Sequence, residues 1–330
     1  MRKNRLKKHH EQLSAGDVVF NILNYAFFLC FTLICFFPFY YLFINTVSTN
    51  SLVQTGKVNF YPMLEYTRTV VEAGEEIVET FTAFGIQLSN YASLIVSSEI
   101  VQAFEVTISR TILGTALMVL ASALVGYVVT KKQMWHRKFW YRFLIITMYF
   151  NAGTIPWYMN MKMLGLTDNF LAYIIPSIVA PYNIILVKTY IESIPAELEE
   201  SAFIDGAGYW AVFSRIVLPL CKPILATIAI FGAVGHWNSF TDSLILMQNN
   251  PSMFTLQHRL YIYLNQSSNL ASLMQGGSVS TAQAEALASS LNNKVIKYTV
   301  SMVSVIPILC VYPFMQRYFE KGIMLGAVKG

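Results

Sequence analysis

A cluster of polar side chains interrupts an apolar stretch of the sequence near residue 240. Its members are His236, Trp237, Asn238, Thr241 and Asp242. A charged carboxylate at the centre of a membrane helix costs about 2.5–3.5 kcal/mol on insertion scales, so we expect Asp242 to face protein or water rather than lipid. Amide, indole and imidazole groups side by side suit the hydroxyls and flat apolar faces of a saccharide. Hydrogen bonding between neighbouring helices is the alternative role for the same residues.

Three further residues with suitable chemistry lie earlier in the chain. Asn151, Trp157 and Asn183 interrupt two other apolar stretches and are candidates to line the same path. Arg110 stands in a third apolar stretch, and we expect its long side chain to reach the membrane surface or to pair with Glu105 or another outer acid.

Motifs for catalysis and for metal binding are missing from the sequence. It contains no G-x-x-x-x-G-K-[ST] phosphate-binding loop, so we expect no nucleotide site in this chain. The four cysteines lack disulfide or ligand spacing and are expected to be small buried apolar side chains. The histidines, which form no metal-ligand set, are His9, His10, His136, His236 and His258. We therefore predict no catalytic residue, no cofactor and no metal site.

The composition predicts that lipid surrounds most of the chain. Hydrophobic residues make up 55% of the 330 positions and charged residues only 12%, whereas soluble domains carry about 25% charged residues. Six apolar stretches are near or above the roughly 20 residues that a helix needs to cross a bilayer. They are residues 19–44, 107–130, 139–160, 169–190, 223–246 and 295–316.

Breaks within two of these stretches indicate a bundle interior. Asn, Gly and Pro residues interrupt 139–160 and 169–190, and such breaks survive in a bilayer only where protein or a water-filled cavity satisfies the backbone. We predict an all-α membrane protein with a six-helix transmembrane domain over residues 19–316.

The distribution of basic residues predicts the orientation of the spans. Residues 1–18 begin with MRKNRLKKHH and are expected to be a basic cytoplasmic tail before an uncleaved anchor, touching anionic lipid rather than nucleic acid. Residues 131–142 and 317–330 are also basic, whereas residues 45–106 are rich in Glu. Both termini should therefore lie in the cytoplasm, with 45–106 and 247–294 outside. Within the second outer loop, TAQAEALASSLNN suggests a short surface helix.

The cytoplasmic connection at residues 191–222 is longer than two neighbouring helices require. It contains LEESAFIDGAGYWAVFSRIVLPL, residues 198–220. Pro195 and the following Glu residues suit the first turn of a helix, which Asp205 and Gly206 should end. A second helix is expected from Trp210 to about Leu218, with an apolar stripe formed by Trp210, Phe213, Ile216, Val217 and Leu220. From these residues alone, the segment could be a structural helix at the membrane surface or a protrusion that docks onto another protein.

The same loop resembles the EAA loop of the membrane subunits of ABC importers. Glu200-Ser201-Ala202, three residues, Gly206, nine residues and Ile216-Val217-Leu218-Pro219 match its spacing, with Ser201 where the family usually has Ala. The flanking sequence is similar to the carbohydrate-uptake branch, specifically to permeases for complex oligosaccharides. Residues 228–247 and 316–330 extend the resemblance, whereas the acidic segment at 62–85 is longer than expected and is treated as an insertion of unknown purpose.

The resemblance implies a type I permease fold and contacts with a separate ATPase. The implied loop contacts are Glu199, Glu200, Ser201, Ala202, Asp205, Gly206 and Ala207. The implied tail contacts are Gly326, Val328, Lys329 and Gly330. Glu200 would meet a basic group of the ATPase, and Ala202 and Gly206 would allow close packing. ATP and Mg would be held by the partner subunits.

The implied assembly is a sugar importer in the cytoplasmic membrane of a prokaryote. This chain would pair with a second homologous permease as a heterodimer, engage two ATPase subunits, and receive oligosaccharide from an extracytoplasmic substrate-binding protein. Two alternatives remain at this point. An ion-coupled secondary transporter also has broken helices and intramembrane acids, although it does not need the 191–222 loop. A non-transporting membrane sensor or scaffold is the other.

Overall fold

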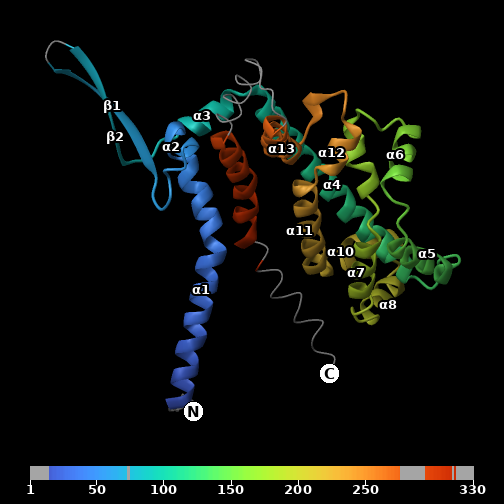
Figure 1. The fold of residues 1–330 in the computed structure, drawn as a ribbon. Helices are drawn as coiled ribbons and strands as arrows, with labels where there is room; N and C mark the ends of the chain where they lie inside the picture. The colour runs from blue at the N-terminus through green and yellow to red at the C-terminus, as the bar shows by residue number, and fades with distance from the viewer. Residues whose placement is uncertain (1–14, 73–74, 276–293, 314–315, 317–330) are drawn as a thin grey trace. The chain divides into compact units, whose positions relative to one another are not determined.

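The computed structural model describes residues 15–72, 75–275, 294–313 and 316. The chain divides into two compact units, residues 1–88 and 89–330, each of which is described by itself. The described residues are mostly helical, with one two-stranded sheet (Figure 1). The chain is thus not purely α-helical.

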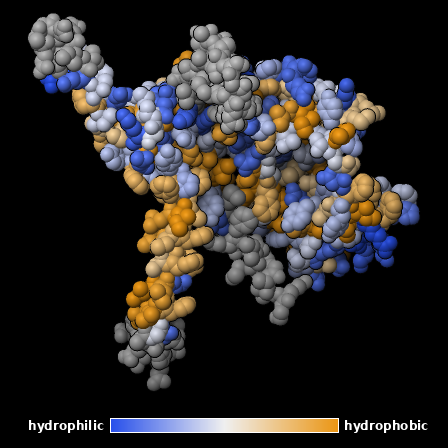
Figure 2. All heavy atoms as spheres, viewed as in Figure 1, coloured by the Kyte–Doolittle hydropathy of each residue, from blue (hydrophilic) through white to orange (hydrophobic). Residues whose placement is uncertain are grey.

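The first unit is dominated by α1, Ala15–Thr46, which contains a candidate membrane span at Gly16–Thr46. Its apolar side chains are exposed along most of its length, and Figure 2 shows the apolar surface on the face in view. Phe20 and Leu23, for example, are 67% and 65% exposed. A helix that is apolar on every side is stable only where lipid or another protein surrounds it.

The acidic segment at 62–85 forms a β-hairpin in this unit. Strands β1, Met63–Glu72, and β2, Glu75–Phe84, pair in antiparallel register after the short helix α2, Asn50–Gln54. Tyr66 lies opposite Phe81 with ring centroids 5.5 Å apart, and Arg68 lies opposite Glu79. Aromatic and opposite-charge pairs of this kind stabilise neighbouring strands. The segment therefore has a defined structure that the sequence did not predict.

The second unit is built around α4, Ser98–Thr130, a continuous helix of 33 residues. It packs against α7, Pro181–Ile191, and α11, Lys222–Asn238 (Figure 1). Gly126 permits the close approach of α7, because a Cβ there would lie 3.0 Å from a methyl group of Val187. The short helix α3, Ser89–Val96, precedes α4.

Three helices in the described residues are long and apolar enough to cross a membrane, namely those at Gly16–Thr46, Ser98–Thr130 and Lys294–Pro313. Two further spans are bent at a break. Phe170–Ser177 and Pro181–Ile191 meet at 42°, and Tyr209–Leu220 and Lys222–Asn238 meet at 76°, which raises the number to as many as five. The count of six and the cytoplasmic location of both termini stay predictions.

The break predicted within 139–160 is confirmed. Helix α5 ends at Tyr149 after starting at Arg137, and α6 runs over Thr154–Met163. Between them the Asn151 side chain accepts a hydrogen bond from the Gly153 backbone N–H at 2.8 Å, and Gly153 has φ of +88°. Such a local side-chain bond competes with the helical pattern, and α6 begins where the chain recovers from the turn.

The break predicted within 169–190 is confirmed. Two short 3₁₀ segments, η1 at Phe170–Tyr173 and η2 at Ile175–Ser177, precede α7. Pro176 and Pro181 each remove a backbone donor and restrict the preceding residue, which prevents one continuous helix. The segment that follows α11 contains α12, Thr241–Leu246, η4, Pro251–Met253, and α13, Leu256–Gln275.

The expected burial of the cysteines is confirmed only for Cys221. Cys30, Cys35 and Cys310 are exposed in this chain, and all four thiols are free. The three exposed residues lie on α1 and on the helix at Lys294–Pro313, much of whose apolar surface is exposed in the described part of the chain.

Candidate functional site

The α8–α10 lobe, residues Glu197–Leu220, lies beyond the end of α4. Helix α8 runs over Glu197–Ile204 and carries three acids in its first turn, where the positive end of the helix dipole favours them. The chain turns after the helix at Gly206, whose φ is +81°, and the Ala207 N–H donates to the Ala202 carbonyl at 2.9 Å. The predicted helix and glycine turn are confirmed, and α9, Tyr209–Val212, follows.

Ala202 is the only buried residue of α8 and fastens the helix to the bundle. It joins an apolar cluster that includes Tyr127 of α4 and Phe213, whose ring centroids are 5.1 Å apart. The Tyr127 hydroxyl also donates to the Tyr209 carbonyl at 3.3 Å. A side chain larger than Ala202 would therefore have to displace the packing between α8 and α4.

An ion pair reinforces this attachment. Lys131, the residue after α4, pairs with Glu199 of α8, and its ammonium nitrogen lies 4.1 Å from the centre of the Tyr127 ring. Both charged side chains are more than four-fifths buried, at 16% and 19% exposure. Because the pair is partly shielded from water, it holds α8 to the end of α4 more firmly than a surface pair would.

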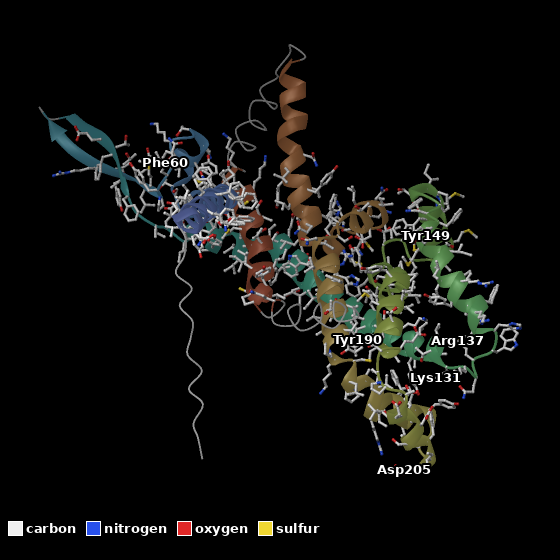
Figure 3. The ribbon with its side chains drawn as sticks, turned by 90° about the horizontal axis from the view of Figure 1, so that it is seen from below. Phe60, Lys131, Arg137, Tyr149, Tyr190 and Asp205 are labelled. Carbon is white, nitrogen blue, oxygen red and sulfur yellow. The ribbon has the colours of Figure 1, made fainter. Side chains whose placement is uncertain are left out.

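The outward side of the lobe combines acids with exposed apolar groups. Ile204 is 86% exposed and Trp210 is 70% exposed, and Glu200 and Asp205 are also exposed. Figure 3 shows Asp205 at the far tip of the lobe, beyond Lys131. Large apolar side chains in solvent beside acids are typical of a surface that docks onto another protein.

The predicted apolar stripe of the second helix is only partly correct. Phe213 and Val217 are buried, but Trp210 and Leu220 are exposed. The cause is a π-helical turn, η3, at Phe213–Val217, after which α10 runs over Leu218–Leu220. A π-turn inserts an extra residue into the helical repeat and so rotates the following side chains onto another face.

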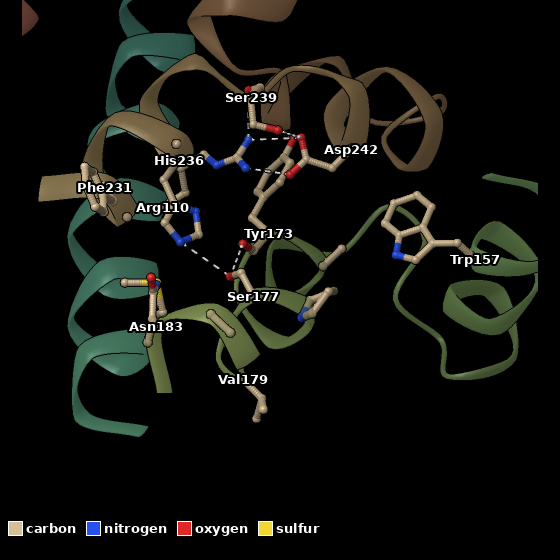
Figure 4. A pocket seen from close by; sticks show the side chains of 16 residues that line it. Arg110, Trp157, Tyr173, Ser177, Val179, Asn183, Phe231, His236, Ser239 and Asp242 are labelled. Atoms are coloured by element: carbon tan, nitrogen blue, oxygen red, sulfur yellow. Dashed lines mark hydrogen bonds and ion pairs between the residues drawn. The ribbon is translucent and has the colours of Figure 1, made fainter. Parts of the chain in front are cut away.

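A cavity of about 450 Å³ with polar and apolar lining lies within the bundle, between α4, η1–α7, α6, α11 and the start of α12 (Figure 4). We call it the central cavity. Its polar and aromatic lining residues are Arg110, Trp157, Tyr173, Ser177, Asn183, Phe231, His236, Ser239 and Asp242. A second cavity of about 350 Å³ shares Trp157, Ser239 and Asp242 with it and adds Asn151 and Thr241.

Arg110 and Asp242 form the electrostatic centre of the central cavity. The Arg110 Nη1 and Nη2 atoms lie 3.2 and 2.5 Å from the two carboxylate oxygens of Asp242, and Nη1 also donates to the Ser239 carbonyl at 3.2 Å. The guanidinium carbon is 4.5 Å from the centre of the Tyr173 ring. Of the roles expected for Arg110, pairing with an acid other than Glu105 is the one found, and its side chain does not reach the membrane surface, because at 1% exposure its charge needs a partner inside the bundle.

A hydrogen-bonded chain continues from Tyr173 toward α13. Its hydroxyl donates to the Met253 carbonyl at 2.6 Å and lies 2.9 Å from the Ser243 Oγ, which is 2.9 Å from the Nδ1 atom of His258. The pKa of His258 is lowered to about 4, mainly by burial and also by the nearby Arg259 charge, while Asp242 opposes the shift. His258 is therefore neutral at pH 7, and the chain ties η1, α12 and α13 together.

The structure brings five of the seven predicted path residues to the two cavities. Asn183, His236, Trp157 and Asp242 line the central cavity, and Asn151 lines the second. In Figure 4, Trp157 lies across the central cavity from His236 and Arg110. The His236 Nε2 is 3.4 Å from the Ser177 Oγ, and the Asn183 amide lies 3.1 Å from the Met118 sulfur.

Trp237 and Asn238 line neither cavity. The Trp237 Nε1 donates to the Ser304 carbonyl at 2.9 Å, and its ring packs edge-on against Phe104 at 6.0 Å, while Asn238 is exposed. Successive residues on a helix point about 100° apart, so neighbours of His236 need not share its face. Trp237 therefore fits the alternative of hydrogen bonding between helices, whereas the exposed Asn238 fits neither role.

Four polar cavity residues escaped the sequence analysis as path candidates, namely Arg110, Tyr173, Ser177 and Ser239. The signal for Arg110 was present, because a charge inside one apolar stretch requires a counter-charge, and Asp242 stands inside another. The tail residues Gly326, Val328, Lys329 and Gly330 and the segment at 281–293 lie outside the described residues.

Comparison with known proteins places the chain among membrane transport components. Residues 92–325 match the family model described as "Binding-protein-dependent transport system inner membrane component". The polygalacturonan/rhamnogalacturonan transport system permease protein YtcP of Bacillus subtilis is 33% identical over 94% of this chain and 99% of its own length. Protein LplC of the same organism is 32% identical over 94% and 95% of the two chains.

A solved structure gives the same result. A chain of a bacterial ABC transporter involved in the import of the acidic polysaccharide alginate superposes with a TM-score of 0.73. The sequences are 27% identical, and the alignment covers 93% of this chain and 98% of the other. The similarity therefore extends over nearly the whole of both chains.

Proposed function

Because the chain belongs to the family of binding-protein-dependent transport system inner membrane components, we propose that it is the permease subunit of an ATP-driven importer for oligosaccharides or polysaccharide fragments. The chain supplies the path and the mechanical coupling, whereas partner ATPase subunits bind ATP and Mg and carry out hydrolysis. No residue of this chain has a catalytic role in the proposal.

The names of the relatives support a saccharide substrate. YtcP is named for polygalacturonan/rhamnogalacturonan transport, and the superposed structure belongs to an importer of alginate. A lactose transport system permease of Rhizobium radiobacter is 25% identical over 95% of this chain. These substrates differ in length and charge but share a carbohydrate backbone, and the proposal extends only that class to this chain.

The attachment of α8 to α4 carries the proposal. Glu199 and Ala202 face the bundle, where an ion pair and an apolar cluster hold them. Glu200, Ser201, Asp205 and Gly206 lie on the exposed side, where a cleft of an ATPase subunit would receive them. A surface that is firmly fixed on one side and exposed on the other is suited to transmit movement.

Helix α4 links this surface to the central cavity. Lys131 at its end and Arg110 in the cavity are 21 residues apart, which corresponds to about 30 Å at 1.5 Å per residue. In the proposed mechanism, ATP binding draws the ATPases together, α8 moves with them, and the Lys131–Glu199 pair conveys the displacement to α4. The cavity then opens outward to accept sugar, and hydrolysis returns it inward.

The central cavity supports a saccharide path. Asp242, Ser239 and His236 offer acceptors or donors to sugar hydroxyls, and Trp157 presents an indole that can pack against a pyranose face. The charges of Arg110 and Asp242 neutralise each other. Inter-helix hydrogen bonding by the same groups stabilises the empty path and is compatible with this role.

The full assembly proposed here includes partners on both sides of the membrane. A second homologous permease would complete the path, two ATPase subunits would bind the coupling lobes and the C-terminal tail, and an external binding protein would deliver sugar. Both termini of this chain would lie in the cytoplasm of a prokaryotic cell.

Transport assays in sealed vesicles test this function. We expect a labelled oligosaccharide, either an oligogalacturonide or a neutral oligosaccharide, to accumulate only with ATP, the assembled transporter and its binding protein. Uptake should persist when proton and sodium ionophores collapse the ion gradients. Loss of uptake with an ionophore while ATP is maintained would contradict the proposal and favour ion coupling.

A further inference from the structure

A basic cavity of about 590 Å³ lies at the same end of α4 as the α8–α10 lobe. It is formed by the α4–α5 connection, the first turns of α5 and one residue of α7. Its basic lining residues are Lys132, His136, Arg137, Lys138 and Lys188. It shares no lining residue with the central cavity, so the sugar path does not account for it.

Positive charge exceeds negative charge around this cavity. Glu192 accepts both the Arg137 Nη2 at 3.1 Å and the Lys188 Nζ at 2.7 Å, so one carboxylate serves two cations. Lys132 and Lys138 are exposed, and none of the described residues that line the cavity is acidic. The cavity is therefore suited to an anion.

Two of its cations are fixed before any ligand arrives. The Arg137 Nε donates to the Val129 carbonyl at 2.7 Å, and the Lys188 ammonium lies 4.4 Å from the centre of the Tyr141 ring. Lys188 has an 11% exposed side chain. Binding an anion here would require ordering only the side chains of Lys132 and Lys138, which reduces its entropic cost.

Exposed aromatic side chains border the cavity. Trp135, Phe139 and Phe143 are 74%, 60% and 49% exposed, and Phe139 also lines the cavity. Aromatic rings beside lysine and arginine are typical of the level of the lipid headgroups. A site for a soluble phosphate compound has no need of such a rim, whereas acyl chains would lie against it.

We propose that this cavity binds the phosphate headgroup of an anionic membrane lipid. Lys132 and Lys138 contact the phosphate, Arg137 and Lys188 provide the fixed positive field, and the exposed rings of Trp135 and the first turns of α5 meet the acyl chains. Basic pockets between membrane helices bind anionic headgroups by the same physics. The site is independent of which sugar the chain carries.

Lipid titration of the purified full chain in a neutral detergent tests the site. Fluorescent phosphatidylglycerol should bind more tightly than the matching phosphatidylcholine. The double variant Lys132→Gln/Lys138→Gln should bind phosphatidylglycerol about 25-fold more weakly, because each lysine near an anionic headgroup contributes roughly a factor of five. Both side chains are exposed, so folding is not at risk from this change.

Arg142→Gln is the control. Arg142 is exposed on α5, the helix that carries Lys138, but it does not line the cavity. Its affinity should stay within about twofold of the unmodified chain. Unchanged binding by the double variant, an equal loss in Arg142→Gln, or equal binding of phosphatidylcholine would each overturn the proposal. Competition by soluble glycerophosphoglycerol as strong as by the intact lipid would identify a soluble-phosphate site instead and would also overturn it.

Discussion

The guanidinium of Arg110 and the carboxylate of Asp242 form a two-point ion pair although 132 residues separate them in the sequence. The pair joins the middle of α4 to the first turn of α12, and the Tyr173 ring covers the guanidinium. The ion pair thus connects α4 and α12 at one wall of the central cavity.

We predict that breaking this pair on one side destabilises the protein more than removing both charges. Arg110→Gln and Asp242→Asn should each lower the free energy of unfolding by about 3–5 kcal/mol, because each leaves a buried group without its partner. The double variant Arg110→Met/Asp242→Leu should recover part of the loss. Unfolding midpoints of the purified protein in detergent measure this, and losses that simply add would contradict the coupling.

Gly206 and Gly208 provide a matched pair for the turn after α8. Gly206 has φ of +81° and Gly208 has φ of −77°, and no atom lies within 4 Å of a Cβ built on either. Gly206→Val should therefore strain the backbone by about 1–2 kcal/mol and reduce sugar-stimulated ATP hydrolysis and uptake, while Gly208→Val should leave both near normal. Equal activities of the two variants would refute a requirement for the left-handed turn.

Reversing the charge of Glu200 should weaken docking of the ATPase. Glu200 is exposed on the first turn of α8, so Glu200→Lys should leave membrane insertion intact while lowering the amount of ATPase that copurifies, and uptake with it. Glu105→Lys is the control, because it reverses the same charge on an exposed residue near the start of α4. Undiminished copurification with Glu200→Lys would argue against the assigned surface.

Two glycines beside the central cavity should differ in their tolerance of alanine. A Cβ at Gly114 would lie 2.5 Å from the His236 ring, whereas one at Gly232 would lie 2.5 Å from the terminal methyl of Met118. Met118 can change rotamer and the imidazole cannot, so Gly114→Ala should cost at least about 1–3 kcal/mol of stability and reduce sugar uptake. Gly232→Ala should change either quantity much less. Thermal unfolding and uptake measured on both variants decide the comparison.

Acid should destabilise the protein through His258. Its folded-state pKa of about 4 lies below the ordinary value of 6.5, so only the unfolded chain takes up a proton between these values. Stability should be unaffected by this group above pH 6.5, fall as the pH drops from about 6.5 to 4, and level off below. The loss amounts to about 3 kcal/mol.

His258→Gln provides the control for that titration. Glutamine does not titrate, so the free energy of unfolding of this variant should vary less between pH 6.5 and pH 4 than that of the unmodified chain. An identical pH dependence of the two proteins would exclude His258 as the source.

The sequence allowed accurate prediction where local signals determine the structure. Glu residues in the first turn, Asp205 and Gly206 mark both ends of α8 within a few positions, and Pro176 and Pro181 mark the break in the fourth stretch. The β-hairpin was missed because its stability depends on cross-strand pairs such as Tyr66 with Phe81, which no single strand reveals.

The central cavity could be predicted only in part for a similar reason. His236, Asn183 and Trp157 were recognised individually by residue type, but Trp237 and Asn238 share the cluster in sequence without sharing its helix face. The ion-pair partner of Arg110 could not be identified from the acids near it in the sequence. Glu105 is only one of several acids that its side chain could reach. Tertiary packing alone selects Asp242.

The continuity of α4 bears on the rate of the proposed transport cycle. A single uninterrupted helix connects Arg110 with Thr130, beside Lys131, so in the proposed mechanism a displacement at one end is passed to the other. Residues 110–130 contain no break in the helix at which such a displacement could be taken up by bending. In the proposed mechanism, we therefore expect the rate of sugar delivery to follow the nucleotide cycle of the partner ATPases, and we expect a substitution that interrupts α4 to uncouple ATP hydrolysis from transport.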